Sequence, residues 1–530
     1  MIPQATERPA RVWSSEQEAI FSWFERDQEG LRAACAVLGL PAVPDAKGHL
    51  VVVARAGTGK TTTILEGTSR APEGRILLAA FNKAIATELQ ARLQNPACEA
   101  KTLHAVGYAA VRRYWERVQI AKGNEREWGL AQEVCGDQVP DAIKRLVGKA
   151  CTKGREIVPH ATEAGPLMDV IVEHELEPDE EWAEAGYGAD YVEHRALEAM
   201  ELAAVRRPKD GIDFADMLYL PVRNKWLVKT YDLVVVDEAQ DMTVTQLEIA
   251  QGVARGRICV VGDDRQAIYA FRGADSESLG RLKEGLRAGE LGLKTTYRCP
   301  RVVVASAKRI VPDFEAAPGA PEGTESRLLS LDALVAAAEP KADDRGKPHD
   351  LIASRTNAPI AGVAMALIRA GKRVRIQGRE FGAGLIGLVK KLSTGKAASS
   401  IPALLERLAR WEDRELARLE KMGREDLQDG VKDKAETLRV VAEGTTGPRE
   451  LEARLGLLFA DDGAKDTVVC SSVHKAKGLE FRRVFVLRPT LHPALPKGKV
   501  RTPKQAIEEA NIEYVAVTRA MDALVWVEAK

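Results

Sequence analysis

The chain has 530 residues, too many for a single hydrophobic core, so several domains are expected. Acidic and basic residues balance at 77 each, which excludes a uniformly basic nucleic-acid-binding protein but not one with a local basic channel. Seven scattered cysteines without a C-x-x-C motif, no apolar run of membrane-spanning length and no apolar signal sequence together predict a cytoplasmic protein without a zinc or iron–sulfur module.

Apolar, strand-like runs alternate with helical stretches along the chain, which predicts parallel α/β layers. The runs are GHLVVVARA (48–56), GRILLAAF (74–81), YDLVVVDEA (231–239), GRICVVGDD (256–264), HDLIASR (349–355) and RRVFVLRP (482–489). Two helical blocks separate these runs into two groups. We therefore expect a first α/β core at 1–108 and 210–289 with a helical insert at 109–209, and a second core at 290–386 and 463–530 with a small helical insert at 387–462.

Both inserts are rich in charge. The second contains a helix with leucines on one face, at Leu405, Leu408, Leu416 and Leu419. The first carries basic residues that either contact phosphates or only solvate helices; they are Lys144, Arg145, Lys149, Lys153 and Arg155.

The loop in VVVARAGTGKTTTILEG (51–67) lies between a predicted strand and a predicted helix. Gly57 and Gly59 let successive backbone N–H groups turn toward phosphate oxygens, and the following helix directs its N-terminal dipole at them. Lys60 then reaches the β- and γ-phosphates, and the Thr61 hydroxyl is placed to bind Mg²⁺. The phosphate-binding residues are expected to be Ala56, Gly57, Thr58, Gly59, Lys60, Thr61 and Thr62, although Ala54 stands where the usual pattern begins with glycine.

A second part of the reaction site follows the strand in YDLVVVDEAQDMT (231–243). Asp237 and Glu238 come directly after it, at the carboxyl edge of a parallel sheet. One carboxylate there can hold Mg²⁺, directly or through water, while its neighbour activates the attacking water. Together with Lys60, the pair predicts a site of phosphate hydrolysis.

These motifs and others between Gln17 and Arg519 resemble the UvrD/Rep/PcrA-type branch of superfamily-one DNA helicases. The motifs are SSEQEAI, AGTGKT, AAFNKAIATEL, KTLHAVGYAA, VVVDEAQD, VGDDRQAIYAFRGA, LKTTYRCP, SSVHKAKGLEFRRV and NIEYVAVTRAMDAL. The resemblance covers nearly the whole chain. It implies two RecA-like P-loop NTPase domains, each interrupted by a helical insert, with ATP hydrolysed between them.

The resemblance also assigns the remaining nucleotide contacts. It implies that Gln17 reads adenine, that Tyr297 lies under it and that Glu480 is at the ribose. It places Gln266, Arg298 and Arg519 at the γ-phosphate. Arginines that reach a transferring phosphoryl group stabilise charge in the transition state.

Contacts to single-stranded DNA follow from the same resemblance. Tyr269 and Phe271 would project to one face of an extended segment and stack bases, a contact worth roughly 1–3 kcal/mol each. The family more often has Trp at the second of these positions, so Phe271 offers a smaller ring. The other implied contacts are Phe81, Asn82, Lys83, Thr102, His104, His474 and Lys477.

The expected function is an ATP-dependent DNA helicase or translocase that moves 3′-to-5′ on single-stranded DNA and acts at duplex junctions. The polarity is implied by the resemblance, because Gln266 is followed by AIYAFRG rather than L-P. Since the chain ends soon after Arg519, a nuclease activity is expected only from a partner protein, and the short second insert favours a compact or partner-activated translocase. The alternatives are an ATP-gated clamp on single-stranded DNA that does not move and, more distantly, a small-molecule kinase.

Overall fold

The computed structural model describes residues 12–178, 180–205, 207, 211–268, 278–394, 400–421, 427–460, 463–492 and 502–529. The chain divides into two compact units. Unit 1 contains the described residues of three segments: those up to Arg55, those of Gly59–Asp264 and those from 278 to Lys294. Unit 2 takes Ala56–Thr58, residues 265–268 and the described residues from Thr295 onward.

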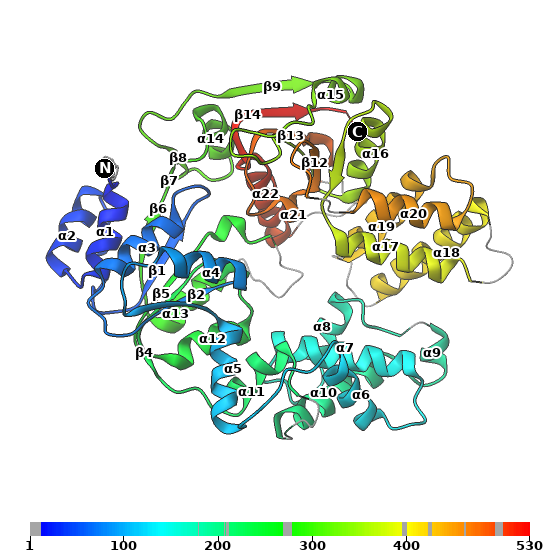
Figure 1. Cartoon of the computed structure of the whole chain (residues 1–530), viewed down its shortest axis with the longest axis horizontal. Coiled ribbons are helices and arrows are strands. Elements are labelled where there is room, and N and C mark those ends of the chain that lie inside the picture. The colour runs from blue at the N-terminus through cyan, green and yellow to red at the C-terminus, as the bar shows by residue number, and fades with distance from the viewer. Residues whose placement is uncertain are drawn as a thin grey trace, which may run out of the picture. The chain divides into compact units, whose positions relative to one another are not determined.

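Unit 1 is built on a six-stranded sheet whose neighbouring strands are all parallel (Figure 1). In the order β3-β2-β4-β5-β1-β6, the strands are Cys98–Thr102, Ile76–Ala80, Tyr231–Val236, Ala254–Gly262, Leu50–Ala54 and Gly289–Leu293. The four runs predicted in this half are β1, β2, β4 and β5, so these predictions are confirmed. The two edge strands were not predicted, because CEAKT and GELGL lack a continuous apolar run and are only partly buried.

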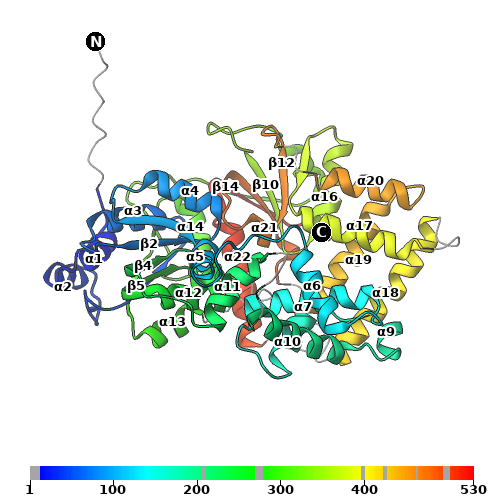
Figure 2. The same cartoon turned by 60° about the horizontal axis from the view of Figure 1, so that its bottom comes forward.

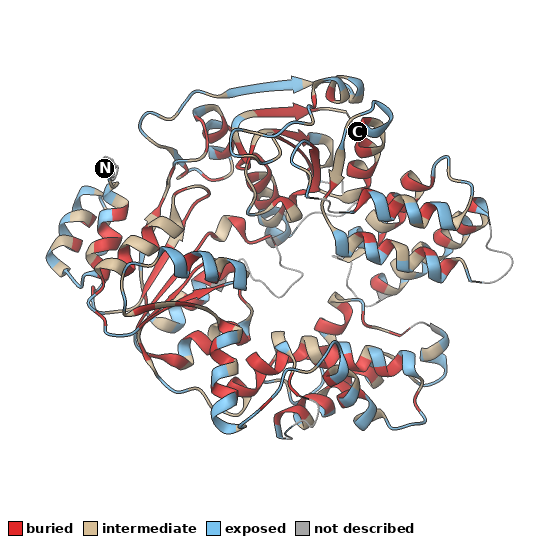
Figure 3. Cartoon of the chain, in the orientation of Figure 1, coloured by how far each residue is buried: buried red, intermediate tan, exposed pale blue. Residues whose placement is uncertain are grey.

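Alternate residues of each strand pack on opposite faces of this sheet. Leu50 and Val52 belong to one core, with helices α1 (Ser15–Phe24), α2 (Gln28–Val37), α3 (Lys60–Arg70) and α4 (Lys83–Arg92). Val51 belongs to a second core on the other face. It is formed with α5 (Leu103–Tyr114), α11 (Phe214–Arg223), α12 (Val244–Val253) and α13 (Ser278–Leu286). Figure 3 shows the result as buried strands between helices that are buried on one side only.

The first insert forms a separate helical core. Its helices are α6 (Glu125–Cys135), α7 (Asp141–Ile157), α8 (Pro166–Glu173), α9 (Glu180–Glu184) and α10 (Ala189–Val205). Figures 1 and 2 show α6, α7 and α10 packed together, and their buried residues cluster with the end of α5 and with α11.

Two of the basic residues of this insert are buried. The Arg155 guanidinium donates to Asp213 and to Asp216, at 2.7 and 2.6 Å, and Lys144 is also inside the core. The suggestion that these two residues contact DNA phosphates is therefore wrong, because neither side chain is accessible to a ligand.

Unit 2 contains a second six-stranded sheet in which every pair of neighbours is again parallel. In the order β11-β12-β10-β13-β14-β9, the strands are Val374–Ile376, Val468–Ser472, Asp350–Ser354, Phe481–Leu487, Ala520–Val527 and Thr324–Leu328. A two-stranded ladder, β7 (Thr295–Thr296) with β8 (Glu315–Ala316), precedes it. The two runs predicted in this half are β10 and β13, which confirms the predicted α/β class for both units.

One face of the second sheet packs on α14 (Arg301–Lys308), α21 (Val473–Ala476) and α22 (Pro503–Val517). The other face packs on α15 (Leu331–Ala337) and α16 (Asn357–Arg369). The second insert continues this latter core with α17 (Arg379–Leu392), α18 (Ile401–Lys421), α19 (Gln428–Ala442) and α20 (Pro448–Leu458).

The leucine pattern of the second insert is confirmed in part, since Leu408 and Leu419 are buried in α18, whereas Leu405 and Leu416 are half-buried. Unlike the first insert, however, this one shares a single hydrophobic core with the sheet beside it. That core joins Ile352 and Val468 of the strands to Leu385, Leu404 and Leu438 of the helices. None of the described helices is long and apolar enough to cross a membrane.

Candidate nucleotide site and DNA-contacting residues

The phosphate loop follows β1, and α3 begins at Lys60. Gly57 and Gly59 have φ angles of +70° and +81°, in the left-handed region that glycine adopts readily. Gly59 is the N-cap of α3 and, because it lacks a side chain, cannot cap the first N–H groups of the helix. The loop therefore has the backbone conformation and the uncapped helix start that suit a bound phosphate.

Lys60 of this loop is paired with the carboxylate predicted to activate water. Its Nζ lies 2.8 Å from Oε2 of Glu238. Burial alone would lower the pKa of Lys60, but Glu238, Asp263 and Asp237 more than offset this, so its pKa is raised above the ordinary value. Lys60 is thus a fixed positive charge at the carboxyl edge of the first sheet.

Asp237 and Glu238 lie at the end of β4, as predicted. The Glu238 backbone has a φ of +51°, unusual for a residue with a side chain, and its N–H donates to Oδ1 of Asp237 at 2.9 Å. Burial first, and the neighbouring Glu238 second, raise the pKa of Asp237 to about 7, although Lys60 opposes them. The positive charge of Lys60 is therefore not enough, in the ligand-free protein, to stabilise the ionised carboxylate of Asp237.

The surroundings of Asp237 suit a magnesium ion. With Glu238, it lines a pocket of about 220 Å³ that is also lined by Thr61, Thr62 and Phe81. Hydroxyl and carboxylate oxygens are the donors that Mg²⁺ prefers, and a divalent cation would supply the positive charge that Asp237 needs. Thr61 and Asp237 thus fit the predicted metal site.

Gln17 lies beside the phosphate loop with both ends of its amide engaged. Its Oε1 accepts from the Ser14 N–H at 3.1 Å, which completes a capping box on α1, and its Nε2 donates to Oγ1 of Thr63 at 2.9 Å. Gln17 therefore ties α1 to the first turn of α3. Its role as the reader of adenine stays a prediction.

In unit 2, two side chains with separate predicted roles are paired with each other. The Arg298 Nε donates to Oε1 of Glu480 at 2.8 Å, and Arg345 lies 3.7 Å from the other carboxylate oxygen. Burial would raise the pKa of Glu480, but Arg298 outweighs it and the pKa is lowered. Tyr297, the predicted adenine platform, is 54% exposed.

Arg519 is almost completely buried, with 1% of its surface exposed. Its guanidinium donates to the backbone carbonyls of Val515 and Leu479 at 3.0 and 3.2 Å and, within unit 2, lies 3.5 Å from Oε1 of Gln266. Burial, followed by repulsion from Arg298, lowers its pKa to about 10, so that it remains charged at neutral pH. The structure thus brings together two of the groups predicted to meet the γ-phosphate.

The predicted DNA contacts of unit 1 lie at two helix starts. Asn82 caps α4 and accepts from the Ile85 N–H at 2.9 Å; Thr102 caps α5 and accepts from the Ala105 N–H at 3.2 Å. Beside them, Lys83 is exposed, and Phe81 is 43% exposed. Asn82 and Thr102 thus have a structural role in addition to the predicted one.

The remaining predicted contacts differ in surroundings. The ring of His104 lies 6.1 Å from that of the exposed Phe214, and burial lowers its pKa, so it is neutral at pH 7. His474 lies in α21, and Lys477 follows that helix directly. Tyr269 and Phe271 lie outside the described residues, so the predicted stacking platform stays a prediction.

Sequence reasoning did not single out two side chains at the edge of the first sheet. Arg55, within the phosphate loop, pairs with Asp263 and Asp264 after β5, and Gln240 bonds to Glu238. Both lie inside quoted motifs. The sequence shows only that each is a polar residue near a predicted site residue, which does not indicate the group to which its side chain bonds.

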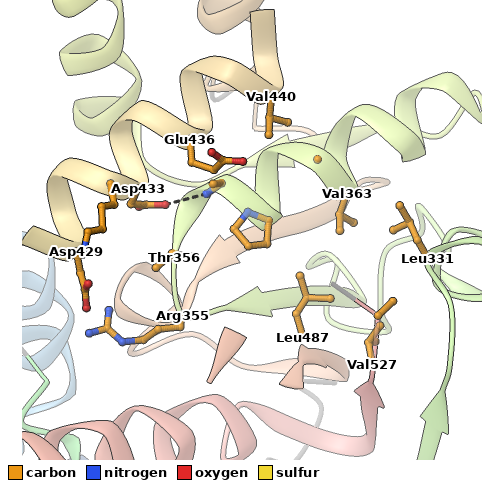
Figure 4. A pocket seen from close by; sticks show the side chains of 15 residues that line it. Leu331, Arg355, Thr356, Val363, Asp429, Asp433, Glu436, Val440, Leu487 and Val527 are labelled. Carbon is orange, nitrogen blue, oxygen red and sulfur yellow. Dashed lines mark hydrogen bonds between the residues drawn. The ribbon is translucent and has the colours of Figure 1, made fainter. Parts of the chain in front are cut away.

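A larger pocket, of about 460 Å³, lies in unit 2 between strand ends and α19 (Figure 4). Its floor is apolar, with Val363, Leu487 and Val527, while Asp433 points at the start of α16 and accepts from the Asn357 and Ala358 N–H groups at 2.7 and 2.9 Å. None of the predicted site residues lines this pocket.

Comparison with known families places the chain. The model of the UvrD/REP helicase N-terminal domain matches residues 40–286, and that of the UvrD-like helicase C-terminal domain matches 452–530; together they cover more than half of the chain. The chain belongs to the UvrD/REP helicase family. The two parallel sheets of this helicase are accordingly its two RecA-like domains, and the resemblance seen in the motifs is confirmed.

Individual relatives of the helicase are distant. The ATP-dependent DNA helicase UvrD2 of Mycobacterium tuberculosis is 27% identical over 89% of this chain and 75% of its own. F-box DNA helicase 1 of Gallus gallus is 25% identical over 90% of the chain and 47% of its own length. The ATP-dependent DNA helicase PcrA of Staphylococcus epidermidis is 24% identical over 51% of the chain and 39% of its own.

Proposed function

We propose that this UvrD-type, ATP-dependent DNA helicase is a translocase that moves 3′-to-5′ on single-stranded DNA and hydrolyses ATP between its two RecA-like domains. The observation that carries the proposal is the division of the reactive groups. The cation of the phosphate loop and both carboxylates belong to unit 1, and the two arginines belong to unit 2. A site that needs both sets links hydrolysis to domain movement.

In this proposal, Glu238 takes a proton from the attacking water. The ion pair with Lys60 opposes that role, because a carboxylate held by an ammonium group is a weaker base. When ATP binds, Lys60 exchanges Glu238 for the phosphate oxygens, and the carboxylate becomes available. The nucleotide itself therefore activates the base.

Thr61 and Asp237 would hold Mg²⁺, which neutralises charge on the phosphates when bound. Arg298 and Arg519 stabilise the charge that develops on the transferring phosphoryl group. For Arg298 this requires leaving Glu480, its present partner. Gln266, beside Arg519, senses the γ-phosphate.

The polarity is proposed from the sequence after Gln266, AIYAFRG, which resembles the branch that moves 3′-to-5′. The DNA contacts are proposed at Phe81, Lys83 and His104 of unit 1 and at His474 and Lys477 of unit 2. The small second insert supports a further proposal: that the protein unwinds weakly alone and acts with a partner such as a nuclease. Strong unwinding of duplex DNA by the purified monomer would contradict this last point.

The test is ATP hydrolysis at steady state with single-stranded DNA of increasing length, with Glu238→Gln as the inactive control. A travelling motor gives a rate that rises with DNA length and then levels off. Stimulation without length dependence would favour the clamp that binds DNA but does not move. Absence of stimulation would contradict the coupling assigned to Gln266, Arg298 and Arg519.

Polarity needs its own measurement. Displacement of streptavidin from the 5′ end of a biotinylated single strand, but not from the 3′ end, is expected for 3′-to-5′ movement. The reverse preference would overturn the proposed direction and leave the ATPase assignment intact.

A further inference from the structure

A buried amide bridges two loops at the edge of the first sheet. Gln240, 1% exposed, lies in the short 3-10 turn η1 (Ala239–Asp241) that follows β4. Its Nε2 donates to Oε2 of Glu238 at 2.7 Å, and its Oε1 accepts from the Asp263 N–H at 3.1 Å. One side chain thus connects the water-activating carboxylate to the backbone that follows β5.

The Asp263 end of this bridge is firmly anchored. The Asp263 side chain is buried, and its Oδ1 accepts from Nη1 of Arg55 at 3.2 Å. Because Arg55 belongs to the phosphate loop, the loops after β1, β4 and β5 all meet at Asp263. The strand end also leaves little room: a Cβ on Gly262 would lie 2.6 Å from the Gln240 Oε1.

The Glu238 end needs such support. The side chain of Glu238 is 37% exposed, and its backbone has the left-handed φ of +51°. Lys60 and Gln240 both donate to Oε2. If Lys60 leaves for the phosphate, as proposed above, Gln240 still holds that oxygen.

We propose that Gln240 is a positioning residue for ATP hydrolysis, which holds the Glu238 carboxylate toward the attacking water and ties it to the loop that leads to Gln266. The inference rests on the proposed role of Glu238. A neutral amide suits the position because it donates at one end and accepts at the other. A glutamate would lose the donor and add a like charge beside Glu238, and a lysine would lose the acceptor.

This arrangement links the base to the nucleotide-sensing segment. Asp263 lies three residues before Gln266 in the chain, so a displacement of this loop pulls on the Gln240 amide and through it on Glu238. Small errors in the position of a reacting group can cost about 10²-fold in rate. Gln240 would thus restrict hydrolysis to the arrangement in which the loop after β5 is in place.

The experiment compares Gln240→Met with Gln246→Met. Methionine has nearly the same shape as glutamine but makes neither hydrogen bond. Gln246 is the matched control, since it is also buried and its amide accepts from the Thr243 N–H, in the capping box of α12, instead of bonding to Glu238. For Gln240→Met we expect a 10- to 100-fold fall in the DNA-stimulated kcat with KM for ATP changed less than about threefold; for Gln246→Met we expect a loss of thermal stability with little change in kcat.

The same comparison in the Glu238→Gln background separates positioning from general damage. If Gln240 acts through Glu238, Gln240→Met lowers the residual kcat little further. If Gln240→Met lowers kcat by the same factor in the Glu238→Gln background as in wild type, the proposal is overturned. It is also overturned if Gln240→Met alone leaves kcat unchanged or if Gln246→Met lowers kcat by an equal factor. If Gln240→Met fails to fold, Gln240→Glu replaces it, with the same expected fall in kcat.

The outcome for Glu238→Gln distinguishes this inference from the proposed function. Normal hydrolysis by Glu238→Gln would overturn the role of Glu238 and the inference with it. An inactive Glu238→Gln with a fully active Gln240→Met would overturn the inference alone.

Discussion

The two RecA-like domains carry their reactive charges in opposite ways. In each, one cation is paired within its own unit at 2.8 Å: Lys60 with Glu238, and Arg298 with Glu480. The group buried beside each pair differs in sign. Unit 1 buries the acid Asp237, whose pKa is raised to about 7, and unit 2 buries the base Arg519, whose pKa is lowered to about 10.

Both shifts have burial as their largest cause, so in each domain the charged form is held at a cost in free energy. A metal ion would relieve the first, and a phosphate the second. The two domains are thus complementary in charge, and under the proposed function each would bind a different part of the same nucleotide.

Replacing Arg519, the buried cation of unit 2, is expected to have the largest effect. Arg519→Ala should lower kcat for ATP on the order of 10³–10⁵-fold, because a transition-state charge loses its partner, while binding of single-stranded DNA stays nearly unchanged. Steady-state ATPase and DNA-binding titrations measure the two quantities. Arg345→Ala, which removes an exposed cation 3.7 Å from Glu480, is the control and should keep near-normal kcat.

Because Arg519 is buried, Arg519→Lys separates loss of charge from loss of fold. It keeps the cation but not the guanidinium geometry that bonds two backbone carbonyls, and we expect it to remain folded and largely inactive. Near-normal hydrolysis by either variant would show that Arg519 only supports the core.

The second largest effect is expected from neutralising Glu238, the acid that is paired with Lys60 in unit 1. Glu238→Gln should lower kcat by about 10²–10⁴-fold, the usual contribution of a general base. ATP binding should be equal or tighter, since Lys60 no longer has to leave an anionic partner. Equilibrium binding of a fluorescent ATP analogue tests this, and weaker binding would contradict the proposed exchange.

The raised pKa of Asp237 predicts a pH dependence with a definite sign. In the ligand-free protein, an acid with a folded-state pKa near 7 and an ordinary value of 3.8 loses its contribution to stability as the pH rises from about 4 to 7. Wild type should therefore lose stability relative to Asp237→Asn over this range. Thermal unfolding at a series of pH values measures the difference, and parallel curves would contradict the assignment.

The same proton competes with the metal ion. As the pH is raised toward 7, the apparent affinity for Mg²⁺ in the presence of ATP should increase by up to about tenfold per pH unit, and above pH 7 it should level off. Magnesium titrations of ATP hydrolysis at pH 6, 7 and 8 test this in wild type. A pH-independent affinity would mean that Asp237 does not take part in binding the metal.

The smallest expected effect concerns the paired acid of unit 2. If Glu480 accepts a hydrogen bond from the ribose, wild type should prefer ATP over 2′- or 3′-deoxyATP by about 1.5 kcal/mol, roughly tenfold in kcat/KM, for at least one analogue. Glu480→Gln should reduce that preference. A preference equal to that of wild type would leave Glu480 only as the partner of Arg298.

Sequence predicted all four internal strands of the first sheet but only β10 and β13 of the second; it missed the internal strands β12 and β14 and the edge strands of both sheets. Runs such as LVVV in β1 and LVVV in β4 are continuous because both faces of a parallel sheet are covered. CEAKT in β3 and TESRL in β9 are edge strands with exposed positions, and their sequences resemble loops. Edge strands need fewer apolar residues, so periodicity misses them.

For the site, sequence predicted the position of residues in the fold better than their contacts. Lys60, Asp237 and Glu238 were placed by strand and loop patterns alone. The Arg298–Glu480 pair could not be foreseen, because 182 positions separate the two residues and only the fold brings them together. The same holds for the burial of Arg519, since an arginine is usually exposed.

The core shared by the second insert and its sheet has a consequence for how the protein comes apart. Helices α17–α20 cover the same hydrophobic cluster as β10 and β12, so neither can open without exposing the other. In hydrogen exchange, the two should lose protection together as one cooperative segment, whereas the first insert, with its own core, can open separately. Removal of residues 387–462 would uncover part of the hydrophobic core that lies on one face of the second sheet and should leave a chain prone to aggregation rather than a smaller enzyme.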